Sequence, residues 1–196
     1  MKLYLAPGAC SLSEHIALLE AGLPFERVIV DLRSKRTQDG RDYNEVNPKG
    51  YVPALVLDDG QTLTENVAIL DWIADRCPRL APTGELAHSR MLEMLAFIST
   101  EIHKQFVRVF FPTGDPEKQA ALQKIGQRLA YIADRLKGDY LLGGDMTVAD
   151  AYLYVMLRWA QAKGCALPPP LPEYKARMER RESVKSALAH ESGGKA

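Results

Sequence analysis

Strand and helix patterns alternate only in the first 77 residues of this chain, and that restriction limits its fold more than any other feature. Residues 2–6 form a short apolar run, residues 12–22 have distinct apolar and polar helix faces, and residues 25–32 alternate as a strand does. This order predicts a β-α-β unit with parallel strands and a right-handed crossover.

The rest of this first segment predicts a hairpin followed by a helix. Residues 33–46 show no strong period, and either a loop or a helix fits them. Asp59-Gly60 lies between two β-prone runs, which is a strong hairpin signal. A helix with one apolar side follows over residues 64–76. The predicted order is therefore β-α-β, a loop or helix, and then β-β-α.

Only helix signals follow "CPRLAPTGE", whose prolines and glycine are typical of a linker. A long helix is expected over residues 85–111, and a second runs from Asp115-Pro116 to Gly138. Thr147-x-x-Asp150 predicts a capping box at the start of a buried third helix.

Two short helices and a proline run at 168–172 complete the second segment. We therefore expect an α/β domain over residues 1–80 and an all-helical domain over residues 86–196.

Charge and cysteine content exclude several classes of protein. Basic and acidic residues number 25 each, and residues 1–80 hold 9 Lys and Arg against 12 Asp and Glu. Neither nucleic acid nor a membrane is therefore an expected partner, and no apolar run approaches the roughly 18 residues of a membrane span. Three widely spaced cysteines form no disulfide framework, which favours free thiols and a cytoplasmic location. No metal site is expected.

Cys10 lies at the predicted junction of the first strand and the first helix. Ser11 and Glu14 fit a capping box, in which Glu14 reaches back to the Ser11 N–H. The Cys10 sulfur could then approach the positive end of the helix, which favours a thiolate. A small apolar residue packed before a cap is the commoner explanation, so both interpretations stay open. Ser13 stands where a dithiol motif of thioredoxin-like proteins has its second cysteine, so a disulfide at Cys10 needs an external thiol.

Three other places in this segment suit a small ligand. A cis bond at Val52-Pro53 would free the Val52 backbone to pair with an extended ligand, although a trans bond is far commoner. Glu65 and Asn66, at a helix start, combine a carboxylate with an anion site and so suit an α-amino acid, although plain capping also explains them. Lys35 could meet a second carboxylate or be a solvated surface lysine.

Five motifs occur in order at suitable spacing: "PGACSLSEHIAL", "NPKGYVPAL", "LTENVAILDWIAD", "STEIHKQF" and "TVADAYLY". Together they resemble the beta class of bacterial glutathione S-transferases over nearly the whole chain. The resemblance implies a thioredoxin-like glutathione-binding domain, an all-helical domain for a small hydrophobic electrophile, and a homodimer. It also implies glutathione as co-substrate, with no tightly bound cofactor.

Motif by motif, the resemblance implies contacts to each part of glutathione. Lys35 would contact the glycine end, and Val52, before a cis-Pro53, would pair with the peptide backbone. Glu65 and Asn66 would hold the γ-glutamyl end.

The resemblance implies Cys10 and His103 as the catalytic residues. Cys10 would bind glutathione or form a disulfide with it, and His103 would face the glutathione sulfur as a donor or an acid–base partner. Thr100, Glu101 and Ile102 would line the site. By pattern alone, a histidine at the edge of an apolar helix face is more often structural.

The expected function is a glutathione transferase, which activates the glutathione thiol against hydrophobic electrophiles or exchanges disulfides through Cys10. Two alternatives stay open: a non-catalytic ligand carrier or regulatory protein of the same fold, and a glutaredoxin-like oxidoreductase with an added domain. Retention of Cys10, Lys35, Glu65 and His103 argues against the non-catalytic alternative. The chain also departs from the family pattern: Asn66 replaces Gly or Ser, and Ala96 replaces a common Asn.

Overall fold

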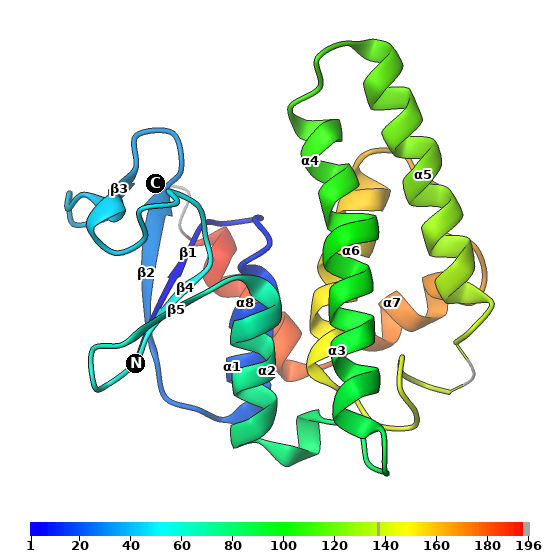
Figure 1. Cartoon of the computed structure of the whole chain (residues 1–196), viewed down its shortest axis with the longest axis horizontal. Helices are drawn as coiled ribbons and strands as arrows, with labels where there is room; N and C mark the ends of the chain where they lie inside the picture. Colours follow the sequence, from blue (N-terminus) through cyan, green and yellow to red (C-terminus); the bar gives the residue numbers. More distant parts are fainter. Residues whose placement is uncertain (137, 194–196) are drawn as a thin grey trace. The chain divides into compact units, whose positions relative to one another are not determined.

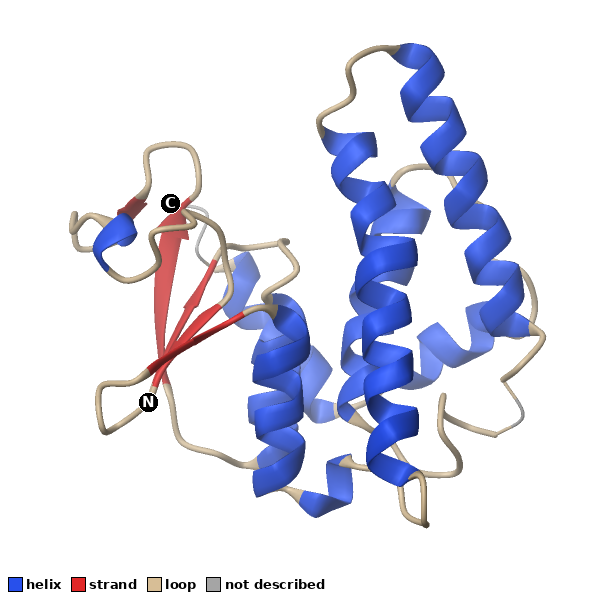
Figure 2. Cartoon of the chain, viewed as in Figure 1, coloured by secondary structure: helices blue, strands red, loops and turns tan. Residues whose placement is uncertain are grey.

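A computed structural model describes residues 1–136 and 138–193 of the chain. Its contacts divide the chain into two compact units, Met1–Cys77 with Arg181–Ala196, and Pro78–Arg180. All the named strands belong to the first unit and the second is helical, which confirms the predicted mixed α/β and all-helical classes (Figure 2).

The first unit contains a five-stranded sheet with the order β3-β2-β1-β4-β5. The strands are β1 (Lys2–Leu5), β2 (Glu26–Asp31), β3 (Arg36–Thr37), β4 (Ala54–Val56) and β5 (Thr62–Thr64). β1 and β2 are parallel and are joined by α1 (Leu12–Ala21), so the predicted β-α-β unit is confirmed (Figure 1). β4 and β5 form the predicted antiparallel hairpin around Asp59-Gly60.

Local sequence accounts for most of the element ends. Gly22 ends α1 in the left-handed conformation, with φ of 69°, and its N–H bonds to the carbonyl groups of the last helical turn. The segment 33–46 forms no α-helix. It contains β3 and a single 3₁₀ turn, η1 (Tyr43–Glu45), which begins where the Asp42 side chain accepts from the Asn44 N–H. The second helix of the first unit is α2 (Asn66–Arg76).

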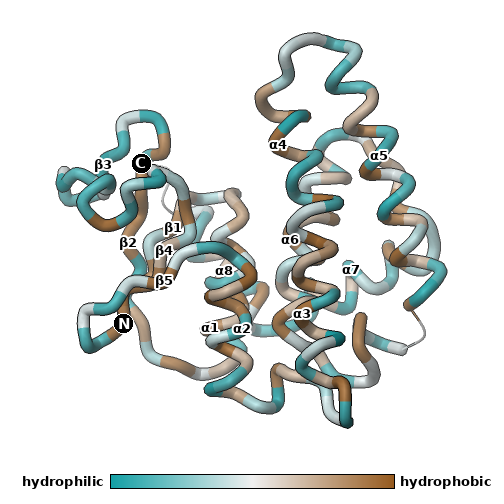
Figure 3. Tube along the Cα trace, viewed as in Figure 1, coloured by the Kyte–Doolittle hydropathy of each residue, from teal (hydrophilic) through white to brown (hydrophobic). Residues whose placement is uncertain are grey.

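Both faces of the sheet are apolar. Leu3 and Leu5 point to one face of β1, and Tyr4 and Ala6 point to the other, because side chains alternate along a strand. The second face is covered by η1, where Tyr43 is fully buried against Ala6 and its neighbours. Figure 3 shows a hydrophobic central part of β2 and a largely hydrophilic loop around β3.

The last helix, α8 (Glu182–Ser192), packs against α1 in the first unit. The helical pattern of the sequence instead predicts it as part of the second domain, residues 86–196. Polar contacts explain its place: Glu20 of α1 accepts from Arg181 and Ser183, and Glu191 accepts from the Gly8 N–H at 2.8 Å.

The second unit begins with a 3₁₀ turn, η2 (Pro78–Leu80), in the predicted linker. The expected long helix is present as three consecutive segments: α3 (Ala87–Phe97), the π-helical η3 (Ile98–His103) and α4 (Lys104–Phe110). The Lys104 N–H reaches back to the Ser99 carbonyl, five residues away. π-Helical turns are rare and occur frequently at functional sites.

The other helices of the second unit are α5 (Asp115–Ala133), α6 (Val148–Ala162) and α7 (Leu171–Glu179). α5 ends at Ala133 and not at Gly138. Gly138 has another use: a Cβ there would lie 2.5 Å from the Gly143 carbonyl oxygen, so only glycine permits this backbone approach. The predicted capping box at the start of the buried α6 is confirmed, with Asp150 accepting from the Thr147 N–H at 2.7 Å.

Candidate functional site

Cys10 stands at the end of the turn that joins β1 to α1. The Ser11 hydroxyl accepts from the Ala6 N–H at 3.1 Å, which ties this turn to the strand. Ser11 is the N-cap residue of α1, but its side chain forms no capping hydrogen bond with the N–H groups of the first helical turn. The predicted capping box is therefore wrong here, because Ser11 bonds to the strand and Glu14 points to other partners.

The Cys10 sulfur lies beside the Val52 backbone. Its Sγ donates to the Val52 carbonyl oxygen at 3.4 Å. Burial, together with the nearby negative charge of Glu14, raises the pKa of the Cys10 thiol to about 12. The expectation that the helix start favours a thiolate is therefore not met in this structure, because desolvation outweighs the effect of the helix dipole. Cys10 is a neutral thiol at neutral pH.

A buried polar cluster that the sequence analysis did not single out surrounds Cys10. The Asn66 amide donates to Glu14 Oε1 at 3.0 Å, and it also lies 3.1 Å from the Ser13 hydroxyl. Ser13 and Glu14 are fully buried, and Asn66 is 8% exposed. The Asn66 side chain, which departs from the Gly or Ser of the family pattern, therefore forms hydrogen bonds with Glu14 and Ser13. No local signal identifies the cluster, since Asn66 is 52 residues from Glu14.

Val52 and Pro53 follow a loop that is fixed by side-chain hydrogen bonds to its backbone. The Tyr51 carbonyl accepts from the Tyr43 hydroxyl at 2.9 Å and from the Asn47 amide at 2.7 Å. The Val52-Pro53 peptide bond is cis, which is the rarer of the two alternatives, and both residues are buried. Among the described residues, the Val52 N–H makes no hydrogen bond.

Lys35 and Glu65 have unusual backbones. Both have positive φ, 56° for Lys35 and 73° for Glu65, a conformation that is costly for residues with a side chain and clusters at functional sites. Lys35 Nζ donates to the Gly50 carbonyl at 2.6 Å, two residues before Val52. Glu65 directly precedes α2, where the first N–H groups of the helix favour an anion.

The Glu65 carboxylate has two partners that the sequence analysis did not predict. Lys49 Nζ lies 2.5 Å from Glu65 Oε1, and the Tyr51 hydroxyl donates to the same oxygen at 2.7 Å. These donors lower the pKa of Glu65. An ammonium group is thus a natural partner of this carboxylate, and Lys49 supplies one from within the chain.

The four predicted site residues of the second unit are consecutive along η3. Thr100 is exposed, and its hydroxyl donates to the Ala96 carbonyl. Glu101 forms an ion pair with Arg128 of α5 at 2.5 Å. Ile102 is fully buried, so its side chain belongs to the core.

His103 is held by aromatic residues of α6. Its Nδ1 lies 2.6 Å from the Tyr152 hydroxyl, and the Trp159 ring packs edge-on against it with ring centroids 5.3 Å apart. Burial, aided by the positive charge of Lys104, lowers the pKa of His103 to about 4. His103 is therefore a neutral imidazole at neutral pH. Tyr152 is 49 residues away in sequence, so the pattern around His103 did not predict this contact.

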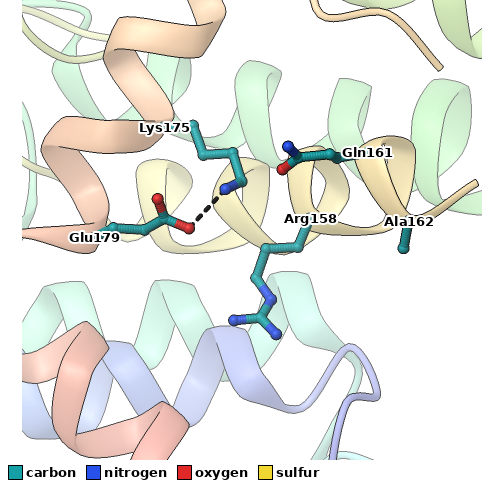
Figure 4. Close-up of a pocket in the computed structure, with 5 residues that line it drawn as sticks. All are labelled: Arg158, Gln161, Ala162, Lys175 and Glu179. Carbon is teal, nitrogen blue, oxygen red and sulfur yellow. Dashed lines mark hydrogen bonds and ion pairs between the residues drawn. The ribbon is translucent and has the colours of Figure 1, made fainter. Parts of the chain in front are cut away.

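A surface pocket of about 350 Å³ is lined by residues of α6 and α7: Arg158, Gln161, Ala162, Lys175 and Glu179 (Figure 4). Lys175 forms an ion pair with Glu179 at 2.6 Å inside it. The pocket has no thiol and no imidazole, and it includes none of the predicted site residues. We therefore place the candidate site at Cys10 and not in this pocket.

Comparison with known proteins identifies the family of the chain. Residues 9–76 match the N-terminal domain model of the glutathione S-transferases, and residues 91–183 match the C-terminal domain model. Glutathione S-transferase GstA of Escherichia coli O157:H7 is 43% identical over 198 residues, which cover 97% of this chain and 98% of that protein.

Two solved structures share the fold and close to half of the sequence. A sphingomonad glutathione S-transferase complexed with glutathione has a TM-score of 0.93 and 46% identity, covering 98% of this chain and 99% of the other. The beta class enzyme of Sphingomonas chungbukensis has a TM-score of 0.92 and 44% identity, covering 97% and 98%. No helix in the described part of the chain has the length and apolar character needed to cross a membrane. The chain therefore belongs to the glutathione S-transferase family, and it is a glutathione transferase that resembles the bacterial beta class.

Proposed function

We propose that the first unit binds glutathione along the Val52 backbone and directs its thiol to a small hydrophobic electrophile. The observation that carries this proposal is the backbone at Val52. Its N–H makes no hydrogen bond among the described residues, and its carbonyl lies 3.4 Å from the Cys10 sulfur. An extended peptide that pairs with this backbone, as an added strand does, would bring a cysteine side chain close to Cys10.

The ends of glutathione suit the charged groups on either side of Val52. Its γ-glutamyl ammonium would meet Glu65, and its α-carboxylate would meet the first N–H groups of α2 at Asn66. Lys35, next to Gly50, would meet the glycine carboxylate. This assignment is supported by the relative whose structure is complexed with glutathione.

In the conjugation reaction, glutathione loses its thiol proton to solvent and attacks as a thiolate. Its sulfur electron pair forms the bond to the electrophilic carbon, and the leaving group departs with the electron pair of the broken bond. Cys10, as a neutral thiol, stabilises the thiolate by turning its single S–H from the Val52 carbonyl to the glutathione sulfur. We assign His103 the same kind of role, since a neutral imidazole has one N–H to donate.

Disulfide exchange is the second reaction we propose for the same site, with oxidised glutathione as the oxidant. The Cys10 thiolate attacks one sulfur, forms a mixed disulfide and releases one glutathione thiolate. A second glutathione thiolate then attacks the glutathione sulfur of the mixed disulfide, which releases oxidised glutathione and restores the Cys10 thiolate. Net reduction therefore needs a disulfide between glutathione and another small thiol as substrate, from which Cys10 takes the glutathionyl group and releases the other thiolate. Because the pKa of Cys10 is raised, this reaction becomes faster as pH rises above neutrality.

A chloro-aromatic substrate and oxidised glutathione separate the two reactions. We expect Cys10→Ala to keep conjugation within about ten-fold and to lose the reducible glutathione adduct seen by intact mass. His103→Phe should lower kcat by about ten-fold or more, and Cys165→Ala is the matched control with both reactions intact. Absence of glutathione binding by calorimetry, together with no adduct on the wild type, would overturn the proposal.

A homodimer and a cytoplasmic location remain proposals that family membership supports. Light scattering on the purified chain tests the first, and a mass of one chain at micromolar concentration would contradict it. Fractionation of cells that express the chain tests the second.

A further inference from the structure

Glu14 is a fully buried acid that none of the steps above uses. It lies in the first turn of α1, four residues after Cys10, and is 0% exposed. Among the described residues its carboxyl group has only neutral hydrogen-bond partners: its own backbone N–H, Ser13 and Asn66. A buried carboxylate without a cation is strongly disfavoured, and such a group takes up a proton instead.

The hydrogen bonds of Ser13 point to the same conclusion from geometry. The Ser13 hydroxyl lies 2.6 Å from the Cys10 carbonyl oxygen and 3.0 Å from Glu14 Oε2. A carbonyl oxygen can only accept, so the single hydroxyl proton of Ser13 belongs to the shorter contact with Cys10. The structure has the Ser13 hydroxyl oriented to donate to Glu14 as well, but its one proton serves only one of the two acceptors at a time. With that proton on the Cys10 contact, the contact with Glu14 is a hydrogen bond when Glu14 is protonated and donates to Ser13.

Asn66 completes this network. Its amide N–H groups donate to Glu14 Oε1 at 3.0 Å and lie 3.1 Å from the Ser13 oxygen. The Ser13 oxygen can therefore accept from Glu14 and Asn66 while it donates to Cys10. With Glu14 ionised, the Ser13 proton would be drawn to the carboxylate and away from the Cys10 carbonyl.

In the described part of the first unit, the elements packed against α1 place no cation in hydrogen-bond or ion-pair contact with Glu14. On α8, His190 and Glu191 both contact His15. On β1, Lys2 pairs with Glu26. From α2, the group that reaches Glu14 is Asn66.

We propose that Glu14 is a positioning residue, held as a neutral acid in the resting protein, and that its ionisation restrains Cys10 by turning Ser13 away and by placing a negative charge beside the thiol. This inference rests on the role proposed above for Cys10. The pKa values agree with it: burial raises the pKa of Glu14 to about 8, and the charge of Glu14 is one cause of the raised pKa of Cys10. The two groups therefore ionise in competition.

The rate of Cys10 alkylation by iodoacetamide, followed by peptide-resolved mass spectrometry from pH 6.5 to 10, tests this directly. Glu14→Gln keeps the shape of the neutral acid and an N–H to donate to Ser13. We expect wild type and Glu14→Gln to react alike below about pH 8 and to diverge above it. The variant should be about five-fold faster near pH 9.5, which corresponds to about 1 kcal/mol of removed repulsion.

Two further variants make the result decisive. Ser13→Ala removes the hydroxyl that links Glu14 to Cys10. It should change the alkylation rate above about pH 8 by less than Glu14→Gln does. Glu26→Gln, an exposed glutamate of β2, is the matched control and should leave the profile unchanged. Identical profiles for wild type, Glu14→Gln and Ser13→Ala would overturn the inference, as would an ionised Glu14 at pH 6.5 by isotope-edited infrared spectroscopy.

Calorimetry with reduced glutathione on the same proteins separates this inference from the proposed function. A divergence above pH 8 in a chain that binds no glutathione would support the role of Glu14 and contradict glutathione binding. If the chain binds glutathione but the alkylation profiles do not diverge above pH 8, the role of Glu14 is contradicted and glutathione binding is supported.

Discussion

Asp150 and Glu14 are both fully buried acids in the first turn of a helix, three residues after a hydroxyl residue, yet the two regions use them differently. Asp150 accepts four hydrogen bonds, from the Thr147 N–H and hydroxyl, the Leu141 N–H and the Tyr174 hydroxyl, all at 2.7–2.8 Å. Within the described part of the chain, Glu14 has its own backbone N–H, Asn66 and Ser13 as partners, and the last two are also hydrogen-bonded to the Cys10 carbonyl.

This difference separates an acid that connects structural elements from one that we propose acts on Cys10. Dedicated donors satisfy the carboxylate of Asp150 and connect the start of α6 to the preceding loop and to α7. The shared donors of Glu14 leave its ionised form poorly solvated, so its protonation state changes with conditions. Burial raises the pKa of both acids. Asp150 has donors of its own that stabilise its ionised form, whereas Glu14 shares its donors with the Cys10 carbonyl.

The largest effect we expect is from Asp150→Ala. The substitution leaves buried donors from three residues without an acceptor and removes the capping box, which should lower the free energy of unfolding by about 4 kcal/mol. Urea unfolding followed by tryptophan fluorescence measures it, with Asp145→Ala on the preceding exposed loop as the control. A loss of unfolding free energy below about 1 kcal/mol would contradict the role of Asp150 in connecting α6 to the preceding loop and to α7.

Glu14→Gln should give a smaller effect whose sign depends on pH. The pKa of Glu14 is raised from 4.5 to about 8, so the folded chain binds this proton more tightly than the unfolded chain does. Its stabilising contribution is complete below about pH 4.5 and is lost as pH rises to about 8. Between pH 5 and 8, wild type should therefore lose about 3 kcal/mol of stability relative to Glu14→Gln. Urea midpoints across this range measure the difference, and parallel curves would contradict it.

Glu191→Ala tests a third buried acid, which lies between these extremes. Glu191 accepts from the Gly8 N–H at 2.8 Å and contacts His15 Nδ1 at 3.2 Å, so it joins α8 to the turn before Cys10. Loss of these two contacts should lower the free energy of unfolding by about 2 kcal/mol. Glu182→Gln, an exposed residue of the same helix, should change it by less than about 0.5 kcal/mol. Equal changes in unfolding free energy for the two variants would show that the buried contacts of Glu191 do not stabilise the fold.

Much of the fold follows from local patterns, and the same two acids show where such patterns fail. Thr147-x-x-Asp150 and Ser11-x-x-Glu14 predict the same capping box, and only the first is present. At Thr147 the backbone is extended, with φ of −116° and ψ of 171°, which directs its side chain to the helix start. At Ser11 it is helical, and the hydroxyl bonds to Ala6 instead.

The candidate site divides in the same way. The position of Cys10 before α1, of Val52 before a β-strand and of Glu65 before α2 follows from strand and helix periodicity. The contacts of Lys49 with Glu65 and of Tyr152 with His103 do not, because each joins segments separated by a loop or a whole helix.

The sequence by itself determined the two-part architecture, the β-α-β unit, the hairpin, the α6 cap and the residues available for chemistry. These depend on interactions within about four positions along the chain and on burial patterns of period 2 or 3.6. Only the tertiary structure decided that the Val52-Pro53 bond is cis, that Glu14 points inward, and that Cys10 and His103 are both neutral. Protonation depends on the surrounding dielectric and charge, which are set by residues such as Asn66 and Tyr152, about 50 positions away in the chain.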